Sequence, residues 1–333
     1  MAATTGPATT GGTIAVVNLH VQIDGLAARV LRAAPRPSAR WPAAPPLTAA
    51  DWLLLIDLLI LRGHVLGRIA DYERAAELAV QFVHDTTDDG TAFLARARTR
   101  AAFHRFADAL ADLDAAELGG VEHATLEAER AVILQATGCY VQAEELHRAA
   151  ARRNPGFATL GALAVLHAER GEVAEAEAMF AGARHRYQGI SPFPLASLDF
   201  RHGLMWYREG NLPAARTWLD ASGRRVPAYA PALGLLAEID TAAGAYEAAV
   251  GRLRPLASSS DDPGYGAKLA CVLDAAGHRE EAEQYRSTAA VRYDELALCH
   301  PEAFGSHAAD FREACGLAPA RPRPRSDRQH ALD

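Results

Sequence analysis

Small and bulky residues recur along this chain at intervals of about 34 residues. Gly138, Gly171, Gly210, Gly244 and Gly277 are separated by 33, 39, 34 and 33 residues. A bulky residue stands two places after most of these glycines, and an alanine stands five places after each. A fixed period of this length predicts a repeat architecture.

Columns of similar residues extend the pattern to seven units when it is continued backwards through His104 and Ala70. Five places after the glycine position, all seven residues are alanine: Ala75, Ala109, Ala143, Ala176, Ala215, Ala249 and Ala282. Seven places before it, all are small: Gly63, Ala97, Ala131, Ala164, Gly203, Ala237 and Ala270. Two places after it they are bulky, with Arg279 as the exception: Tyr72, Phe106, Tyr140, Val173, Leu212 and Tyr246.

The spacing predicts that each unit is a helix, a tight turn and a second helix. Glycine suits the left-handed conformation that ends the first helix. Small side chains in both columns let the two helix axes cross closely. Units are expected to begin near Ile56, Gly90, Ala124, Phe157, Ala196, Ala230 and Pro263, with a longer connection at 185–194 between the fourth and fifth.

The pattern over roughly residues 56–296 resembles the tetratricopeptide repeat (TPR) family, which has small residues in both helices and Gly-x-aromatic at the turn. Proline, which closes the family's repeat, stands at the junctions of four units: Pro155, Pro192, Pro227 and Pro263. The resemblance implies an all-α, right-handed α-solenoid of about seven helix-turn-helix repeats with flanking cap helices.

Composition outside the repeats predicts five segments. We expect a disordered N-terminus at 1–12 and a cap helix with a Pro-rich linker at 13–47. The solenoid is expected at 48–298, with Thr48 or Asp51 capping its first helix. A second cap helix is expected at 299–317, and a disordered Arg- and Pro-rich tail at 318–333.

The charge of the chain gives no reason to expect a nucleic-acid partner. The net charge is −7, so no general attraction to polyanions is expected. Lys268 is the only lysine, so 33 of the 34 basic residues are arginine (34 − 1). With the many alanines, this indicates codon bias in a GC-rich bacterial genome. We interpret the arginines as solvated surface residues.

Cysteine spacing and hydrophobicity predict a soluble protein of the reducing cytoplasm. None of the four cysteines forms a CxxC pair, and the N-terminus is a poor signal peptide. The most apolar stretch, WLLLIDLLIL at 52–61, is about half a membrane span. We therefore expect no membrane span.

The sequence shows no catalytic motif and no recognisable cofactor site. Motifs for a nucleophile elbow, a zinc protease, a P-loop or a dinucleotide fold are absent. Paired aspartates at 88–89 and 261–262 are expected to form turns and helix caps. Zinc-ligand residue types gather near the C-terminus without a known spacing, so we expect no metal site there: Cys299, His300, His307 and Cys315.

The resemblance implies that the first helices of the units line a concave groove. Carrying the family's groove places onto this chain gives Asp57, His64, Arg68, Arg98, Gln135, Glu169, Phe200, Tyr207, Arg208, Glu238 and Asp274. These residues are basic towards the N-terminus and acidic towards the C-terminus, which favours an extended peptide with opposite charges at its ends. The Lys/Asn clamp for chaperone tails is not found at these places.

Aromatic residues gather near the longer fourth connection. Phe193, Phe200, Trp206 and Tyr207 either form a ligand shelf or fill space around an irregular joint. We expect the longer connection to bring Phe193 to the concave side, near Phe200 and Tyr207. With Arg208 beside it, this cluster is the expected principal partner site.

The fold resemblance leads to three hypotheses on function. The first is a non-catalytic scaffold that binds a protein or peptide in its groove. The second is an accessory protein of a specialised-metabolite pathway that binds an enzyme or an apolar intermediate. SPFPLASLDFRHGLMW at 191–206 is similar to stretches in bacterial TPR proteins, and the pathway this implies is of the enediyne polyketide type. An enzyme of unknown class is the third.

Overall fold

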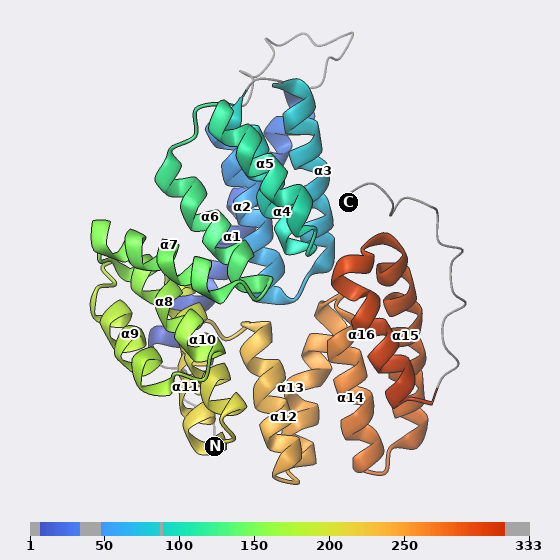
Figure 1. Cartoon of the computed structure of the whole chain (residues 1–333). Helices are drawn as coiled ribbons and strands as arrows, with labels where there is room; N and C mark the ends of the chain where they lie inside the picture. Colours follow the sequence, from blue (N-terminus) through green and yellow to red (C-terminus); the bar gives the residue numbers. More distant parts are fainter. Residues whose placement is uncertain (1–6, 34–47, 87–88, 317–333) are drawn as a thin grey trace, which may run out of the picture.

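Helices are the only regular elements in the residues that the computed structural model describes, 7–33, 48–86 and 89–316. The prediction of an all-α fold is confirmed (Figure 1). The helices are α1 (Pro7–Ala33), α2 (Ala49–Leu66), α3 (Ile69–Asp85), α4 (Gly90–Ala102), α5 (Phe106–Leu118), α6 (His123–Ala136), α7 (Tyr140–Arg153), α8 (Phe157–Glu169), α9 (Val173–His185), α10 (Pro192–Arg208), α11 (Leu212–Arg225), α12 (Ala230–Ala242), α13 (Tyr246–Ser259), α14 (Pro263–Ala275), α15 (Arg279–Cys299) and α16 (Pro301–Ala314).

Seven consecutive helix pairs, from α2–α3 to α14–α15, form the solenoid, and α1 and α16 flank it (Figure 1). The first pair begins with a capping box, in which Thr48 Oγ1 accepts from the backbone N–H of Asp51 at 3.2 Å. In return, the Asp51 carboxylate accepts from the backbone N–H of Thr48 at 2.9 Å. Each side chain thus satisfies a backbone donor that the helix cannot pair.

Both columns of small residues are buried. All seven alanines of the second helices have an exposed fraction of 0%. The glycines and alanines of the first helices are buried as well. A Cβ atom on Gly203 would lie 2.8 Å from Cγ of Leu219, so α10 and α11 approach too closely for a larger residue. The predicted repeat register is therefore correct.

The turns inside the pairs use the left-handed conformation that the sequence predicts. The five turn glycines have φ between 73° and 89°. His104 occupies the same place in the second pair with φ 58°, and it is the one non-glycine residue with positive φ in the described ranges. The first pair differs, because Gly67 makes its turn and α3 begins at Ile69, one turn earlier than the pattern predicts.

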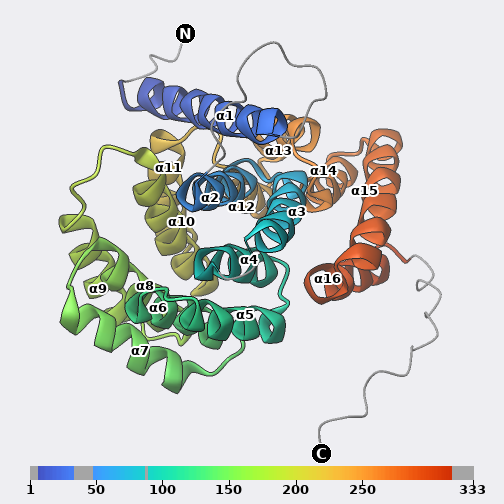
Figure 2. The same cartoon turned by 90° about the horizontal axis from the view of Figure 1, so that it is seen from above.

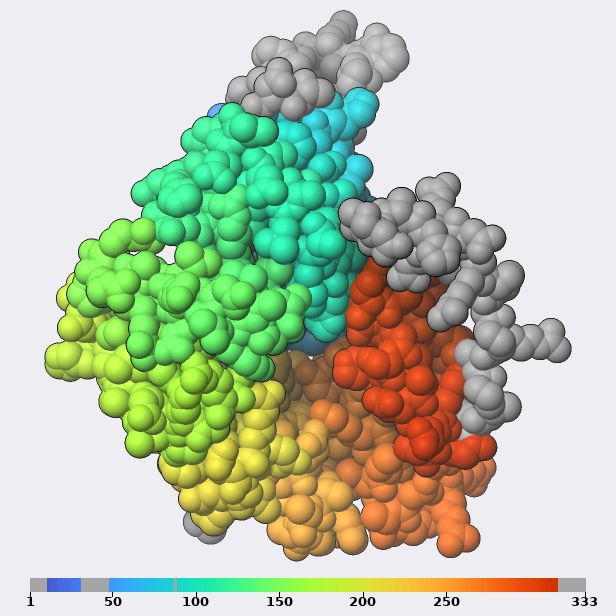
Figure 3. Space-filling model, viewed as in Figure 1, coloured from blue at the N-terminus to red at the C-terminus, as the bar shows by residue number. Residues whose placement is uncertain are grey.

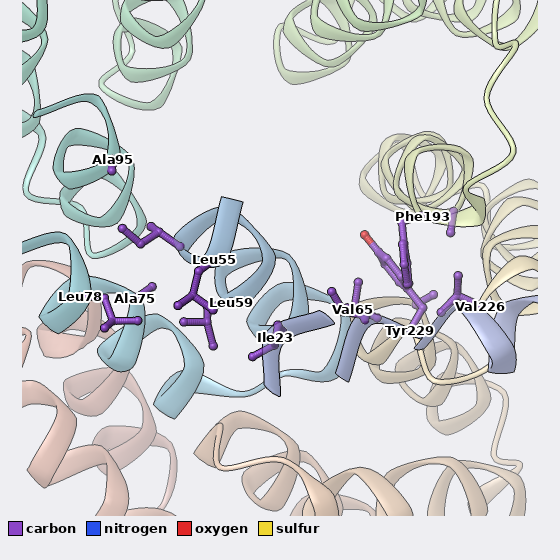
Figure 4. Packing of buried hydrophobic residues seen from close by; sticks show 14 of the residues in the cluster. Ile23, Leu55, Leu59, Val65, Ala75, Leu78, Ala95, Phe193, Val226 and Tyr229 are labelled. Atoms are coloured by element: carbon purple, nitrogen blue, oxygen red, sulfur yellow. The ribbon is translucent and has the colours of Figure 1, made fainter. Parts of the chain in front are cut away.

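The solenoid closes on itself, which the repeat pattern does not predict. Seen from above, the pairs curve round until α12 of the sixth pair lies against α2 of the first (Figure 2). One hydrophobic cluster joins α1, α2, α3, α4, α10, α11 and α12. Figure 4 shows Val65 of α2 facing Tyr229, with Phe193 beside it. Tyr229 has an exposed fraction of 0% in this cluster.

Polar contacts reinforce the closure at the start of α3. The carboxylate of Asp261 accepts hydrogen bonds from the backbone N–H groups of Ile69 at 2.6 Å and Ala70 at 2.8 Å. Ser260 Oγ donates to the carbonyl oxygen of Gly67. Asp261 is thus a helix cap, as predicted, but for a helix of the first pair rather than for its own unit.

The C-terminal helices complete the ring against the first two pairs. The His300 ring stacks on Phe103 with centroids 3.9 Å apart, and its Nε2 lies 3.2 Å from the Glu73 carboxylate. Leu296 of α15 and Ala303 of α16 are buried in one cluster with Ile69 and Phe103. The end of the chain therefore packs on its beginning.

The N-terminal helix α1 lies across α2, α10 and α11 and buries Leu19 and Ile23 there. It begins at Pro7, inside the stretch expected to be disordered. Close packing explains its reach, since a Cβ atom on Gly12 would lie 1.9 Å from the carbonyl oxygen of Arg225. The predicted Pro-rich linker at 34–46 and the tail at 318–333 lie outside the described residues.

Many arginines are held in ion pairs, so their interpretation as solvated surface is wrong for these positions. Charges rarely leave water unless a partner compensates them, and arginine pairs with carboxylates in bidentate geometry. In four helix pairs a buried aspartate meets an arginine of the partner helix at 2.7–2.8 Å: Asp71 with Arg62, Asp112 with Arg96, Asp199 with Arg225, and Asp240 with Arg252.

Candidate functional site

Hollows follow one another along the inner face of the ring, where the first helices of the later pairs lie. Of three hollows along α6 to α14, the largest, of about 580 Å³, lies between the α4–α5 turn, α6, α8 and α10. Its wall is mostly apolar, and Figure 3 shows a depression at the centre of the ring between the green pairs and the red α16. The lining residues used below are His104, Gln135, Ala158, Val165, Glu169 and Arg201.

A second hollow of about 390 Å³ lies between α10, α12 and α14. A small third hollow lies beside both, since it shares Arg201 with the first and Leu204 with the second. The three therefore form a row along α6 to α14, the shape that an extended chain fits.

The first hollow contains a short chain of hydrogen bonds. His147 Nε2 donates to Gln135 Oε1 at 3.2 Å, and Gln135 Nε2 donates to Glu169 Oε2 at 2.8 Å. Burial lowers the pKa of His147, so its imidazole stays neutral at pH 7. Gln135 and Glu169, both predicted groove residues, thus line the hollow and hold each other.

The second hollow is lined by Phe200, Tyr207 and Glu238, three more of the predicted groove residues. Tyr207 Oη donates to Glu238 Oε2 at 2.8 Å, and Lys268 Nζ lies 2.6 Å from Glu238 Oε1. Burial and the Glu238 carboxylate raise the pKa of Tyr207 to about 12. Tyr207 therefore acts as a neutral donor at physiological pH.

Predicted groove residues of the first two pairs are engaged inside the ring. Arg98 Nη1 lies 2.7 Å from Asp57 Oδ2, and Arg98 also pairs with Glu129 at 2.8 Å. Burial raises the pKa of Asp57, although Arg98 opposes the change. His64 Nε2 and the Tyr229 hydroxyl are hydrogen-bonded at 2.7 Å across the closure.

The charge gradient expected along the groove is largely neutralised by pairing. Arg68 lies 3.6 Å from Asp71, and Asp274 pairs with Arg286. Glu238 is paired with Lys268 as described above. Of the predicted charged groove residues, Arg208 is exposed and pairs with no described residue.

The expected aromatic shelf is divided between the core and the groove. Phe193 is buried in the closure cluster, with an exposed fraction of 9%. The reason is that α10 begins at Pro192, so Phe193 belongs to its first turn instead of a protruding loop. Trp206 Nε1 donates to Glu177 Oε1 at 2.8 Å. Of this cluster, Phe200 and Tyr207 line the second hollow.

His300 and three of the paired aspartates have structural partners. The described ranges contain no group of three or more His, Cys, Asp or Glu residues placed to hold a metal ion. Asp89 caps α4 through the Thr91 N–H at 2.8 Å, and Asp262 caps α14 through the Gly264 N–H at 2.8 Å. Asp88 lies outside the described residues. None of the described helices has the length and hydrophobicity to cross a membrane.

The groove positions carried over from the family did not include Arg201, which lies on the inner face of the ring. It is half-buried on α10, lines two hollows, and makes no hydrogen bond or ion pair with another described residue. It stands nine places before Gly210, in a column that is also charged at Glu129 and Lys268. Charged residues that recur at the same place in several repeats indicate a position that faces solvent or a ligand. This recurrence was the signal by which Arg201 could have been found.

Comparison with known proteins found no matching family model and no matching curated protein. A tetratricopeptide repeat protein from Parabacteroides merdae matches with a TM-score of 0.53 and 16% identity, over 79% of this chain and 99% of that chain. A chain of the APC/C hetero-tetramer Cut9–Hcn1 matches with a TM-score of 0.50 and 15% identity, over 90% of this chain and 54% of that chain.

At these identities the matches bear on the fold alone. They agree with the buried alanine columns, the turn glycines and the seven helix pairs. The resemblance predicted from the sequence is therefore confirmed: the chain is an α-solenoid with the tetratricopeptide-repeat fold.

Proposed function

We propose that this protein is a non-catalytic scaffold that binds a segment of another protein along the inner face of α6 to α14. The observation that carries the proposal is the row of three adjacent hollows, which combines apolar walls with a few polar groups. Binding sites commonly have this composition, since apolar surface supplies affinity and polar groups fix orientation.

The closure of the ring limits where a partner can bind. Pairs one and two turn much of their inner face into the core, whereas pairs three to seven keep theirs accessible. The proposed site therefore includes Gln135, Glu169, Phe200, Tyr207 and Glu238. It does not include Phe193 or the first-pair residues of the predicted groove.

A photo-crosslinking experiment in the native host tests this proposal. p-Benzoylphenylalanine is placed at Ala158, which is exposed and lines the largest hollow. A matched variant carries it at Ala178, which is exposed on the outer helix α9. We expect a specific protein adduct from position 158 and none from position 178. Adducts of equal yield from both would contradict the proposal.

The size of the largest hollow favours a second candidate, an accessory protein that holds an apolar biosynthetic intermediate or its enzyme. Its volume of about 580 Å³ lies in the range of small-molecule sites. Four free cysteines fit a reducing bacterial cytoplasm in either case. Native mass spectrometry of protein purified from its host distinguishes the two, since a bound small molecule adds a discrete mass without a protein adduct.

A further inference from the structure

Arg201 differs from the other half-buried arginines because it has no ion-pair partner among the described residues. Arg62, Arg96 and Arg98 each contact a carboxylate at 2.7 Å. The Arg201 guanidinium has no such contact among the described residues, although it lines the largest hollow and the small one beside it. Keeping a guanidinium partly out of water without a counter-charge is costly, so this position favours an incoming anion.

Arg208 supplies a second cation on the same inner face of α10. It lines the small hollow with Arg201, is exposed, and also pairs with no described residue. Seven residues of α-helix separate the two, which corresponds to two turns and about 10 Å along the helix axis. An extended peptide covers the same distance in about three residues.

The surroundings specify the rest of the ligand. Val165, Ala168, Leu204 and Met205 line the small hollow together with the two arginines. Glu169, the one acidic residue there, already accepts a hydrogen bond from Gln135. The small hollow thus offers two guanidinium groups against one carboxylate, among apolar side chains.

We infer that this inner face recognises an acidic peptide segment in extended conformation, in which two carboxylates three residues apart bind Arg201 and Arg208 and the residues between them are apolar. The inference rests on the proposed scaffold function and adds the chemistry of its partner. A carboxylate binds guanidinium through charge-assisted, bidentate hydrogen bonds, which are stronger than neutral ones.

Fluorescence polarisation with labelled peptide pools tests the inference on the full-length protein. The acidic pool consists of six-residue peptides with aspartate at the second and fifth places and an equimolar mixture of alanine, valine, leucine and phenylalanine elsewhere. Two matched pools carry asparagine or lysine in place of aspartate. We expect the acidic pool to bind at least about tenfold more tightly than the asparagine pool, as one lost charge-assisted contact already implies.

Three variants locate the contact. Arg201→Gln should weaken binding of the acidic pool about tenfold and leave binding of the asparagine pool unchanged. Arg208→Gln should act in the same direction but less strongly, because an exposed charge is screened. Arg224→Gln, which removes an exposed arginine of α11 that pairs with no residue in the described ranges, is the matched control and should have no effect.

Several results would overturn the inference. Equal affinity for the aspartate and asparagine pools would do so, as would an Arg201→Gln protein that binds like the wild type, or the absence of binding by any pool. Displacement of the acidic pool by succinate alone would assign the site to a free small acid instead of a peptide. Tight binding of the asparagine or lysine pool, with an adduct at position 158, would leave the scaffold function intact and remove only the charge preference.

Discussion

His64 Nε2 lies 2.7 Å from the Tyr229 hydroxyl, although 165 residues separate them in the chain. The bond joins α2 of the first helix pair to the residue that precedes α12 of the sixth pair. It lies beside a buried apolar cluster, so the His64 nitrogen depends on the Tyr229 hydroxyl, which is also hydrogen-bonded to Ser197.

Removing the Tyr229 hydroxyl should therefore destabilise the protein. Tyr229→Phe keeps the ring and leaves the His64 nitrogen without its partner, at a cost of about 1–3 kcal/mol in the free energy of unfolding. Urea denaturation measures the loss. Tyr246→Phe is the control, since that hydroxyl bonds to no other described residue and should be dispensable. Equal losses in the two variants would show that the His64 contact contributes nothing.

Acidification should weaken the same junction. Burial, together with the nearby Arg201 charge, lowers the pKa of His64 from 6.5 to about 4. Between these two pH values His64 is protonated in the unfolded chain and neutral in the folded protein. The stabilisation is therefore complete above pH 6.5 and is lost as the pH falls towards 4, by at most about 3 kcal/mol.

A variant separates this effect from other titrations. His64→Gln cannot titrate, so its free energy of unfolding should fall less than that of the wild type between pH 7 and pH 4. Urea denaturation at several pH values gives both curves. Parallel curves would contradict the role of His64, whatever the contributions of His147 and His202, whose pKa values are also lowered by burial.

The buried Asp199 carboxylate is expected to be costly to neutralise. It has an exposed fraction of 0% and pairs with Arg184 and Arg225. Asp199→Asn leaves two guanidinium groups without their counter-charge and should cost about 3–5 kcal/mol. Asp114→Asn breaks an ion pair at a carboxylate that is 74% exposed and should cost less than about 1 kcal/mol. If chemical denaturation shows a larger loss of unfolding free energy for Asp114→Asn than for Asp199→Asn, this account is refuted.

Enlarging one alanine of the repeat should separate two packed helices. Ala143 is completely buried in α7, so Ala143→Leu should cost about 1–3 kcal/mol through overpacking. Glu145→Leu places the same side chain at an exposed position without an ion pair to a described residue. Thermal denaturation should show a lower melting temperature for the first variant only, and no difference between the variants would disprove tight packing at this column.

The sequence was sufficient to predict the repeats, because each repeat contact joins residues a fixed distance apart. Ala109 and Ala143 are buried for the same reason at the same place in successive units. The turn glycines follow from a local need for positive φ, and they were predicted for that reason.

The closure of the ring could not be predicted from these periods, because it joins residues that share no repeat relationship. One signal was present in WLLLIDLLIL at 52–61, a segment that is apolar except for Asp57. A helix that is apolar on most sides packs against several neighbours, and α2 contacts α1, α3, α4 and α12. The candidate site was predicted only in part for the same reason. The closure takes His64 and Phe193 out of the groove, whereas Tyr207 still lines a hollow.

Contact between the two ends of the solenoid also changes how the protein should unfold. In an open array each repeat touches only its neighbours, so a terminal repeat can melt while the others persist. Here His300 and Leu296 hold the first pair, and the first pair in turn holds the sixth. Fraying at either end must break contacts at the other. We therefore expect a single cooperative transition, and a deletion confined to α16 should increase hydrogen exchange in α3, at the opposite end of the sequence.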